Sequence, residues 1–256
     1  MNSSAKAAAR WSNTETAERE RRLGRLAAMA GLGSVAVTLF AILIGASGAL
    51  HGPEPGVTPS DTQSLHGIYV SAHDQLIGNA ARGVGLVLSA GVGLFLYDAA
   101  RRRGASLGKW FIPVLCVGTV LYAADFWIGY GIVHHAAVRY HDAHLTGKAA
   151  SKYASHLLHT GVARWLPLID ILLRVSFGAW LLIIAYYTFL VGLLSRALAI
   201  WGAGSGLAIP FLAGGDTIFL GWILVVSSLI AGYWPGGRPP AWDTFPRLSL
   251  QARMAK

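Results

Sequence analysis

Residues 125–174 read DFWIGYGIVHHAAVRYHDAHLTGKAASKYASHLLHTGVARWLPLIDILLR and indicate the fold class. Two apolar segments, one carrying Asp125 and the other Asp170 and Arg174, enclose a polar segment with six of the nine histidines. A helix of about 20 apolar residues crosses the hydrocarbon core of a bilayer. The stretch therefore predicts two membrane-spanning helices joined by an outward-facing, histidine-rich loop.

The remainder of the chain has the same apolar character. Hydrophobic residues make up 54% of the 256 residues and charged residues 13%, and the mean hydropathy is +0.49, values that are rare in soluble proteins. Six apolar blocks have about the length of a membrane span. They are residues 27–50, 76–99, 111–133, 166–194, 197–214 and 217–234. The sequence predicts an all-α, polytopic integral membrane protein with six transmembrane helices.

The basic residues predict the direction of insertion, because Lys and Arg accumulate in short cytoplasmic loops. They are concentrated before the first block, in the run Arg101 to Arg103, and in the tail after residue 234. Segment 51–75 has no Lys or Arg, and the longer segment 134–165 has four. Both termini are therefore expected in the cytoplasm, with loops 51–75 and 134–165 outside.

This topology divides the chain into three regions. Residues 1–26 are expected to form a cytoplasmic segment with a short charged helix, since Ser12 and Glu15 have the spacing of a capping box. Residues 27–234 form the six-helix domain, and residues 235–256 form a cytoplasmic tail rich in Pro and Gly. The net charge of +9 is explained by topology and by attraction to the lipid bilayer, so no nucleic-acid partner is expected.

Glycines at short intervals are expected to permit close approach between helices. Gly83, Gly85 and Gly93 form such a stripe in block 76–99. Gly202, Gly204 and Gly206 are expected to do the same in block 197–214.

Four charged residues fall inside the predicted spans, in the half of the bilayer that faces outward. They are Arg82, Asp125, Asp170 and Arg174. A charge in that position costs at least about 2.5–3.5 kcal/mol, so its placement calls for an explanation. Asp170 and Arg174 have the i, i+4 spacing of an ion pair along one helix, which leaves Arg82 to pair with Asp125 across two spans. Three interpretations stay open: an ion-pair cluster that fixes helix packing, a polar ligand-binding cavity, and a shifted topology with these groups among the headgroups.

The histidines of segment 134–165 are candidate metal ligands. His141 with His144, and His156 with His159, have i, i+3 spacing, and imidazole suits zinc and copper. No established zinc or copper motif is matched. A solvated loop whose histidines titrate near neutral pH is the alternative.

The sequence WPGGRPPAWD at residues 234–243 resembles the ending of a group of uncharacterised bacterial membrane proteins of about this length and number of spans. The residues LSRAL at 194–198, followed by a glycine-rich block, are similar to a six-span family with a domain of unknown function. The resemblance implies a multi-pass protein of the bacterial plasma membrane and implies no activity.

The leading functional hypothesis is a non-enzymatic binding or accessory membrane protein with a polar site at the outer ends of the second to fourth spans. Its partner would be a small ligand, a metal ion or another membrane subunit. The alternative is a small-solute transporter, or one coupled to ions or protons, that uses the four charges. The spans contain no nucleophile–base pair and no metal motif, so an enzyme is the less favoured class.

Overall fold

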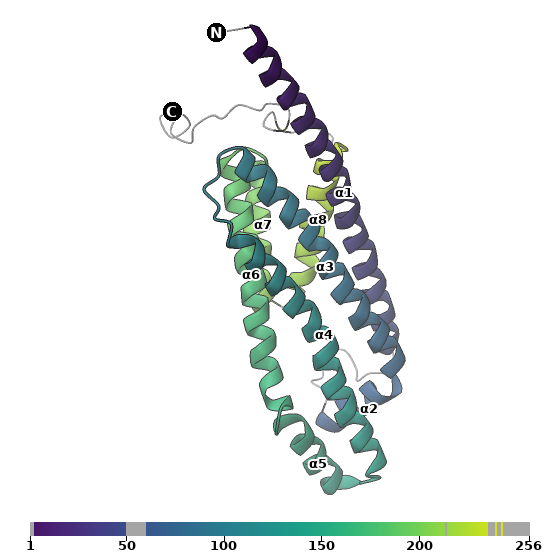
Figure 1. Cartoon of the computed structure of the whole chain (residues 1–256). Coiled ribbons are helices and arrows are strands. Elements are labelled where there is room, and N and C mark those ends of the chain that lie inside the picture. The colour runs from purple at the N-terminus through teal and green to yellow at the C-terminus, as the bar shows by residue number, and fades with distance from the viewer. Residues whose placement is uncertain (1–2, 50–59, 213, 235–238, 240–241, 243–256) are drawn as a thin grey trace. The chain divides into compact units, whose positions relative to one another are not determined.

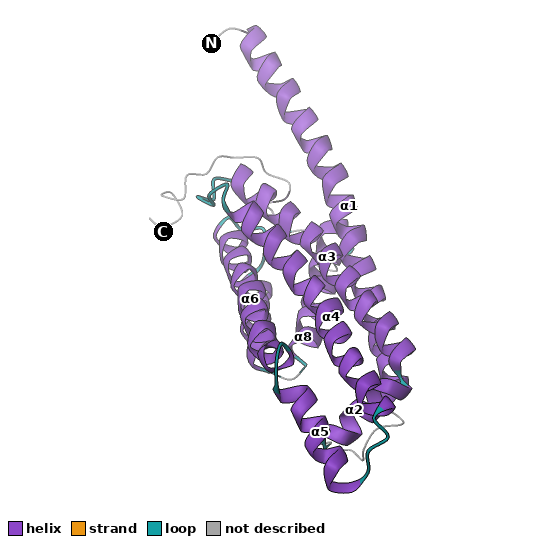
Figure 2. Ribbon diagram, turned by 60° about the horizontal axis from the view of Figure 1, so that its bottom comes forward, coloured by secondary structure: helices purple, strands orange, loops and turns teal. Residues whose placement is uncertain are grey.

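The computed structural model describes residues 3–49, 60–212, 214–234, 239 and 242. Within these residues the regular structure is helical, which confirms the predicted all-α class (Figures 1 and 2). The elements are α1 (Ser3–Ala49), α2 (Asp61–Val70), α3 (Ala72–Arg102), α4 (Phe111–Asp142), α5 (Gly147–His159), η1 (Ala163–Trp165), α6 (Leu166–Leu190), α7 (Arg196–Phe211) and α8 (Gly215–Ala231).

Four helical segments in the described residues are long and apolar enough to cross a membrane. They are Glu18–Gly45, Ala72–Arg102, Phe111–Asp142 and Ala163–Leu190. The last two apolar blocks are also helical, but α7 and α8 have 16 and 17 residues. At 1.5 Å per residue these helices are about 24–26 Å long, somewhat less than the ~30 Å hydrocarbon core. The fold is thus compatible with a membrane protein.

The chain forms two compact units. Unit 1 comprises Met1–Val35, Leu88–Val117 and Val175–Lys256, and unit 2 comprises Ala36–Val87 and Gly118–Arg174. Each of the long helices α1, α3, α4 and α6 contributes residues to both units.

Unit 1 depends on close helix packing at small residues. A Cβ atom added to Gly178 of α6 would collide with the carbonyl oxygen of Gly206 in α7, so only glycine permits this approach. A Cβ on Gly202 would lie 2.7 Å from the indole nitrogen of Trp222 in α8, whereas one on Gly204 meets nothing within 4 Å. Two of the three glycines of α7 therefore face neighbouring elements, as the stripe predicted, and Gly204 does not.

Unit 2 contains a small core of its own. Leu65 of α2, Ala136 and Ala137 of α4, and Ala154 of α5 are buried together, and Tyr140 packs against them. The helix α2 begins with a complete capping box, in which Ser60 and Gln63 satisfy each other's backbone N–H groups. This core fixes α2 and α5 against the C-terminal half of α4.

Two expectations about helix boundaries are corrected. The segment 134–165 is mostly helical: α4 continues to Asp142, α5 follows, and only His144 of the six histidines lies in a turn. No Gly or Pro interrupts residues 134–142, so nothing in the sequence ends the helix at 133. At the other end, α1 begins at Ser3, so Ser12 lies inside the helix rather than at its start. The predicted tail lies outside the described residues except for Pro239 and Trp242.

Candidate functional site

Asp170 and Arg174 form an ion pair on α6. The helix begins directly after the turn η1 and carries Pro167 in its first turn, where the missing N–H costs nothing. One turn separates the two side chains, and Nε of Arg174 lies 2.8 Å from each of the two oxygens of Asp170. The i, i+4 spacing thus produces the pairing expected along a single helix.

The helix α4 adds two more groups to this pair. Asp125 is half-buried and interacts electrostatically with both Asp170 and Arg174. The guanidinium carbon of Arg174 lies 5.9 Å from the ring centre of Tyr122, whose side chain is buried. We call Tyr122, Asp125, Asp170 and Arg174 the polar cluster. It holds two carboxylates and one guanidinium, so it has an excess of one acid when all three are ionised.

Arg82 does not join the polar cluster. In the part of the chain that the structure describes, it forms no ion pair with Asp125. Its neighbour Gly83 faces α4, since a Cβ added there would lie 3.2 Å from the carbonyl oxygen of Ala123. Successive residues of a helix point about 100° apart. Arg82 is therefore turned toward α1, where its Nη2 would lie 3.9 Å from a Cβ on Gly45.

The candidate metal ligands are held apart by contacts at opposite ends of α2. The ring of His141 stacks on Tyr69 with centroids 3.9 Å apart, and His144 lies edge-on to His141 at 6.1 Å. Nε2 of His159 lies 3.5 Å from an oxygen of Asp61. Asp61 and Tyr69 are eight residues apart, about 12 Å along the helix.

The two histidine pairs accordingly do not converge. No group of three or more His, Cys, Asp or Glu side chains that suits a metal ion occurs among the described residues. The structure does not assemble a zinc or copper site from His141, His144, His156 and His159.

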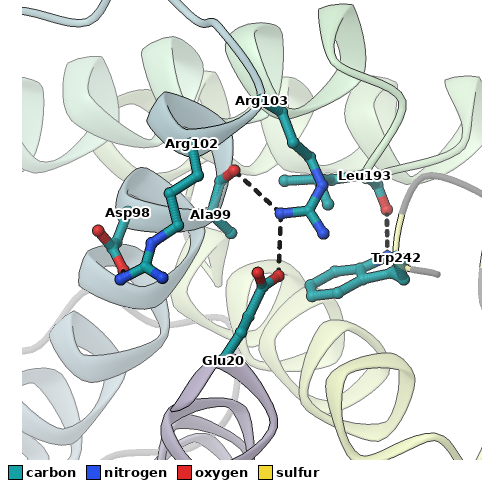
Figure 3. Close-up of polar contacts among 7 residues, drawn as sticks. All are labelled: Glu20, Asp98, Ala99, Arg102, Arg103, Leu193 and Trp242. Carbon is teal, nitrogen blue, oxygen red and sulfur yellow. Dashed lines mark hydrogen bonds and ion pairs between the residues drawn. The ribbon is translucent and has the colours of Figure 1, made fainter. Parts of the chain in front are cut away.

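A second charged site, in unit 1, was not predicted (Figure 3). Arg103, just after α3, places Nη1 2.9 Å from Oε1 of Glu20 in α1 and donates from the same nitrogen to the carbonyl oxygen of Ala99 at 3.1 Å. Trp242 lies beside them, with its ring centre 5.7 Å from the Arg103 guanidinium carbon. Its indole N–H donates to the carbonyl oxygen of Leu193, which follows α6, at 2.9 Å.

Packing explains why these residues come together. Glu20 starts a stripe of buried small residues on α1 that continues through Gly24, Ala27, Ala28 and Gly31. This spacing places Glu20 on the helix face that contacts protein rather than solvent. The spacing of these small residues is visible in the sequence, so the burial of Glu20 could have been predicted from it. Nothing in the sequence predicts that Glu20 pairs with Arg103 or that Trp242 lies beside them.

The comparisons with known proteins add no family. No protein-family model, curated protein or solved structure matches this chain.

Proposed function

We propose that the chain is a non-enzymatic binding or accessory protein of the bacterial plasma membrane, which crosses the bilayer six times with both termini in the cytoplasm. Unit 1 supports this topology by bringing together Glu20, Arg103, Leu193 and Trp242. The first and second predicted spans lie between Glu20 and Arg103, the third and fourth between Arg103 and Leu193 just after α6, and the fifth and sixth between Leu193 and Trp242. Six crossings therefore place all four on one side of the membrane, as their contacts require.

The polar cluster supports the binding role. The side chains of Asp170 and Arg174 are 34% and 28% exposed in the isolated chain. Apolar neighbours on α6, including Ile171 and Leu172, are exposed as well, which is typical of a surface that faces lipid. Charged groups at such a surface are costly unless another polar group covers them. A partner subunit or a small polar ligand that contacts Asp125 and the exposed edge of the Asp170–Arg174 pair would supply that cover without opening the pair.

A transporter is the alternative. The Asp170–Arg174 ion pair counts against it, because a closed pair leaves neither group available to a passing ion. Asp125 favours it, since this carboxylate takes part in none of the ion pairs among the described residues and remains a candidate carrier of a proton or cation. Both functions would use the second carboxylate of the polar cluster, either to bind a ligand or to carry an ion.

Co-purification from native membranes distinguishes these functions. A binding or accessory role predicts that a specific protein or small molecule is recovered with the wild-type chain and lost with Asp125→Asn and with the double variant Asp170→Asn/Arg174→Gln. Asp98→Asn is the matched control, because Asp98 forms an i, i+4 pair with Arg102 outside the polar cluster. Proton or cation flux in proteoliposomes that is abolished by Asp125→Asn would establish the transporter instead.

Accessibility labelling tests the topology. A chain with Cys116→Ser carries no cysteine, so single cysteines can be added at chosen sites. Asp142→Cys is expected to react with an impermeant maleimide in intact cells, and Ser106→Cys only after permeabilisation. The reverse pattern would overturn the proposed orientation.

A further inference from the structure

One face of α5 gathers cationic and hydroxyl side chains along a shallow, wide-open surface groove with a volume of about 520 Å³. The opposite face packs on protein, because Ala154 is buried with Leu65 of α2 and Ala136 of α4. The residues of α5 that line the cavity are Lys148, Ser151, Lys152, Ser155, His156 and His159. Amphipathic packing therefore directs every basic residue of α5 to one exposed groove.

The lining of this groove consists of hydrogen-bond donors and contains no carboxylate. Lys148 and Lys152 carry three N–H donors each and no acceptor, and serine hydroxyls also donate. An acid lies at the far end of the helix, where an oxygen of Asp61 is 3.5 Å from Nε2 of His159. The two lysines would repel a metal cation, whereas an anion would be attracted by both.

The start of α5 adds positive potential to the same end of the groove. Its N-cap residue Thr146 makes no side-chain hydrogen bond, and the first turn contains no acid. The N–H groups of that turn are left without a side-chain acceptor, and the positive end of the helix dipole lies beside Lys148. Lys148 and Lys152 are one turn apart, about 6 Å along the axis, with Ser151 beside them.

We propose that this groove binds a phosphate-type oxyanion. The ammonium groups of Lys148 and Lys152 provide the charge, and the hydroxyls of Ser151 and Ser155 donate hydrogen bonds to the remaining oxygens. His156 and His159 extend the groove toward Thr160, so it accommodates a ligand with more than one anionic group. The ligand is either a free oxyanion or the headgroup of an anionic lipid. The assignment is independent of the function proposed for the polar cluster.

The test uses the full chain purified in a non-ionic detergent. Pyrophosphate is titrated by calorimetry, and retention of added phosphatidylglycerol is measured by native mass spectrometry. The double variant Lys148→Gln/Lys152→Gln is expected to lose about tenfold or more in affinity, because it removes both cationic groups that attract the anion. Lys152→Arg is expected to keep binding, and Lys109→Gln, an exposed lysine of unit 1, is the control.

Each outcome decides the assignment. Pyrophosphate binding that depends on the two lysines establishes a site for a free oxyanion. Lysine-dependent retention of phosphatidylglycerol without pyrophosphate binding establishes a headgroup site. The proposal fails if the wild type binds neither probe, if the double variant binds as well as the wild type, or if zinc binds instead and requires His156 and His159.

Discussion

Arg103 and Glu20 form a buried ion pair, with Nη1 and Oε1 2.9 Å apart and side chains that are 5% and 10% exposed. The two residues are more than 80 positions apart in the sequence, and each comes from an arginine-rich segment. Water has little access to either group, so the attraction between them is weakly screened. The pair therefore joins the N-terminal helix to the end of α3 within unit 1.

Breaking this pair is expected to destabilise the protein strongly. Arg103→Met leaves the Glu20 carboxylate buried without its cation and should lower the free energy of unfolding by about 3–5 kcal/mol. Thermal unfolding in detergent measures the loss. Asp98→Asn is the control, because the Asp98–Arg102 pair is 48% and 23% exposed and should contribute about 0–1 kcal/mol. Equal shifts in the two variants would contradict a buried, unscreened pair.

Trp242 is expected to stabilise unit 1 through its indole. The residue is 9% exposed, and its ring stacks on Phe95 with centroids 5.9 Å apart. Trp242→Ala should cost about 3 kcal/mol, as for other buried aromatic residues. Trp110→Ala should cost much less, because Trp110 is 62% exposed. Trp242→Phe keeps an aromatic ring but removes the donor to Leu193 and part of the buried indole, so it should cost more than the ~1 kcal/mol of a hydrogen bond alone and less than Trp242→Ala. A melting temperature unchanged in Trp242→Ala would show that the indole does not stabilise the fold.

The contact between α6 and α7 is expected to tolerate no side chain at Gly178. Gly178→Ala inserts a methyl group against the carbonyl oxygen of Gly206, so the helices must separate and the melting temperature should fall by several degrees. Gly204→Ala in α7 meets nothing within 4 Å and should be neutral or stabilise by about 0.4–1 kcal/mol, because alanine favours the helix. The close approach of α6 and α7 would be disproved by a fully stable Gly178→Ala protein.

Substitutions of Asp170 and Arg174 are expected to have coupled effects on stability, whereas the effects of substituting Arg82 and Asp125 are expected to add. A double-mutant cycle with Asp170→Asn and Arg174→Gln should give a coupling of about 1 kcal/mol or more. The cycle with Arg82→Gln and Asp125→Asn should give a coupling near zero, because the guanidinium of Arg82 faces Gly45 of α1. Detergent melting curves of the six single and double variants supply both values. A large Arg82–Asp125 coupling would contradict the structure.

Local spacing in the sequence was sufficient to predict several of these features. Apolar blocks of about 20 residues determined the helical class, because a helix is the element that satisfies its own backbone hydrogen bonds in lipid. The four-residue interval between Asp170 and Arg174 determined their ion pair, since both groups are carried by one rigid helix. The close approaches at Gly202 and Gly206 followed from glycine spacing in the same way.

Only the tertiary structure decided which charges meet. Arg82 and Asp125 were predicted to pair because both fall at a similar depth in their predicted spans. Depth does not specify the direction in which a side chain leaves its helix, and in the structure Gly83 rather than Arg82 faces α4. Glu20, Arg103 and Trp242 meet because three distant segments pack together, a relationship that spacing along the chain does not encode. The histidines of the opening stretch were grouped by sequence proximity, but α2 contacts them at its two ends and keeps them apart. Periodicity within one helix is a local property, whereas the rotation of each helix toward its neighbours is set by packing of the whole unit.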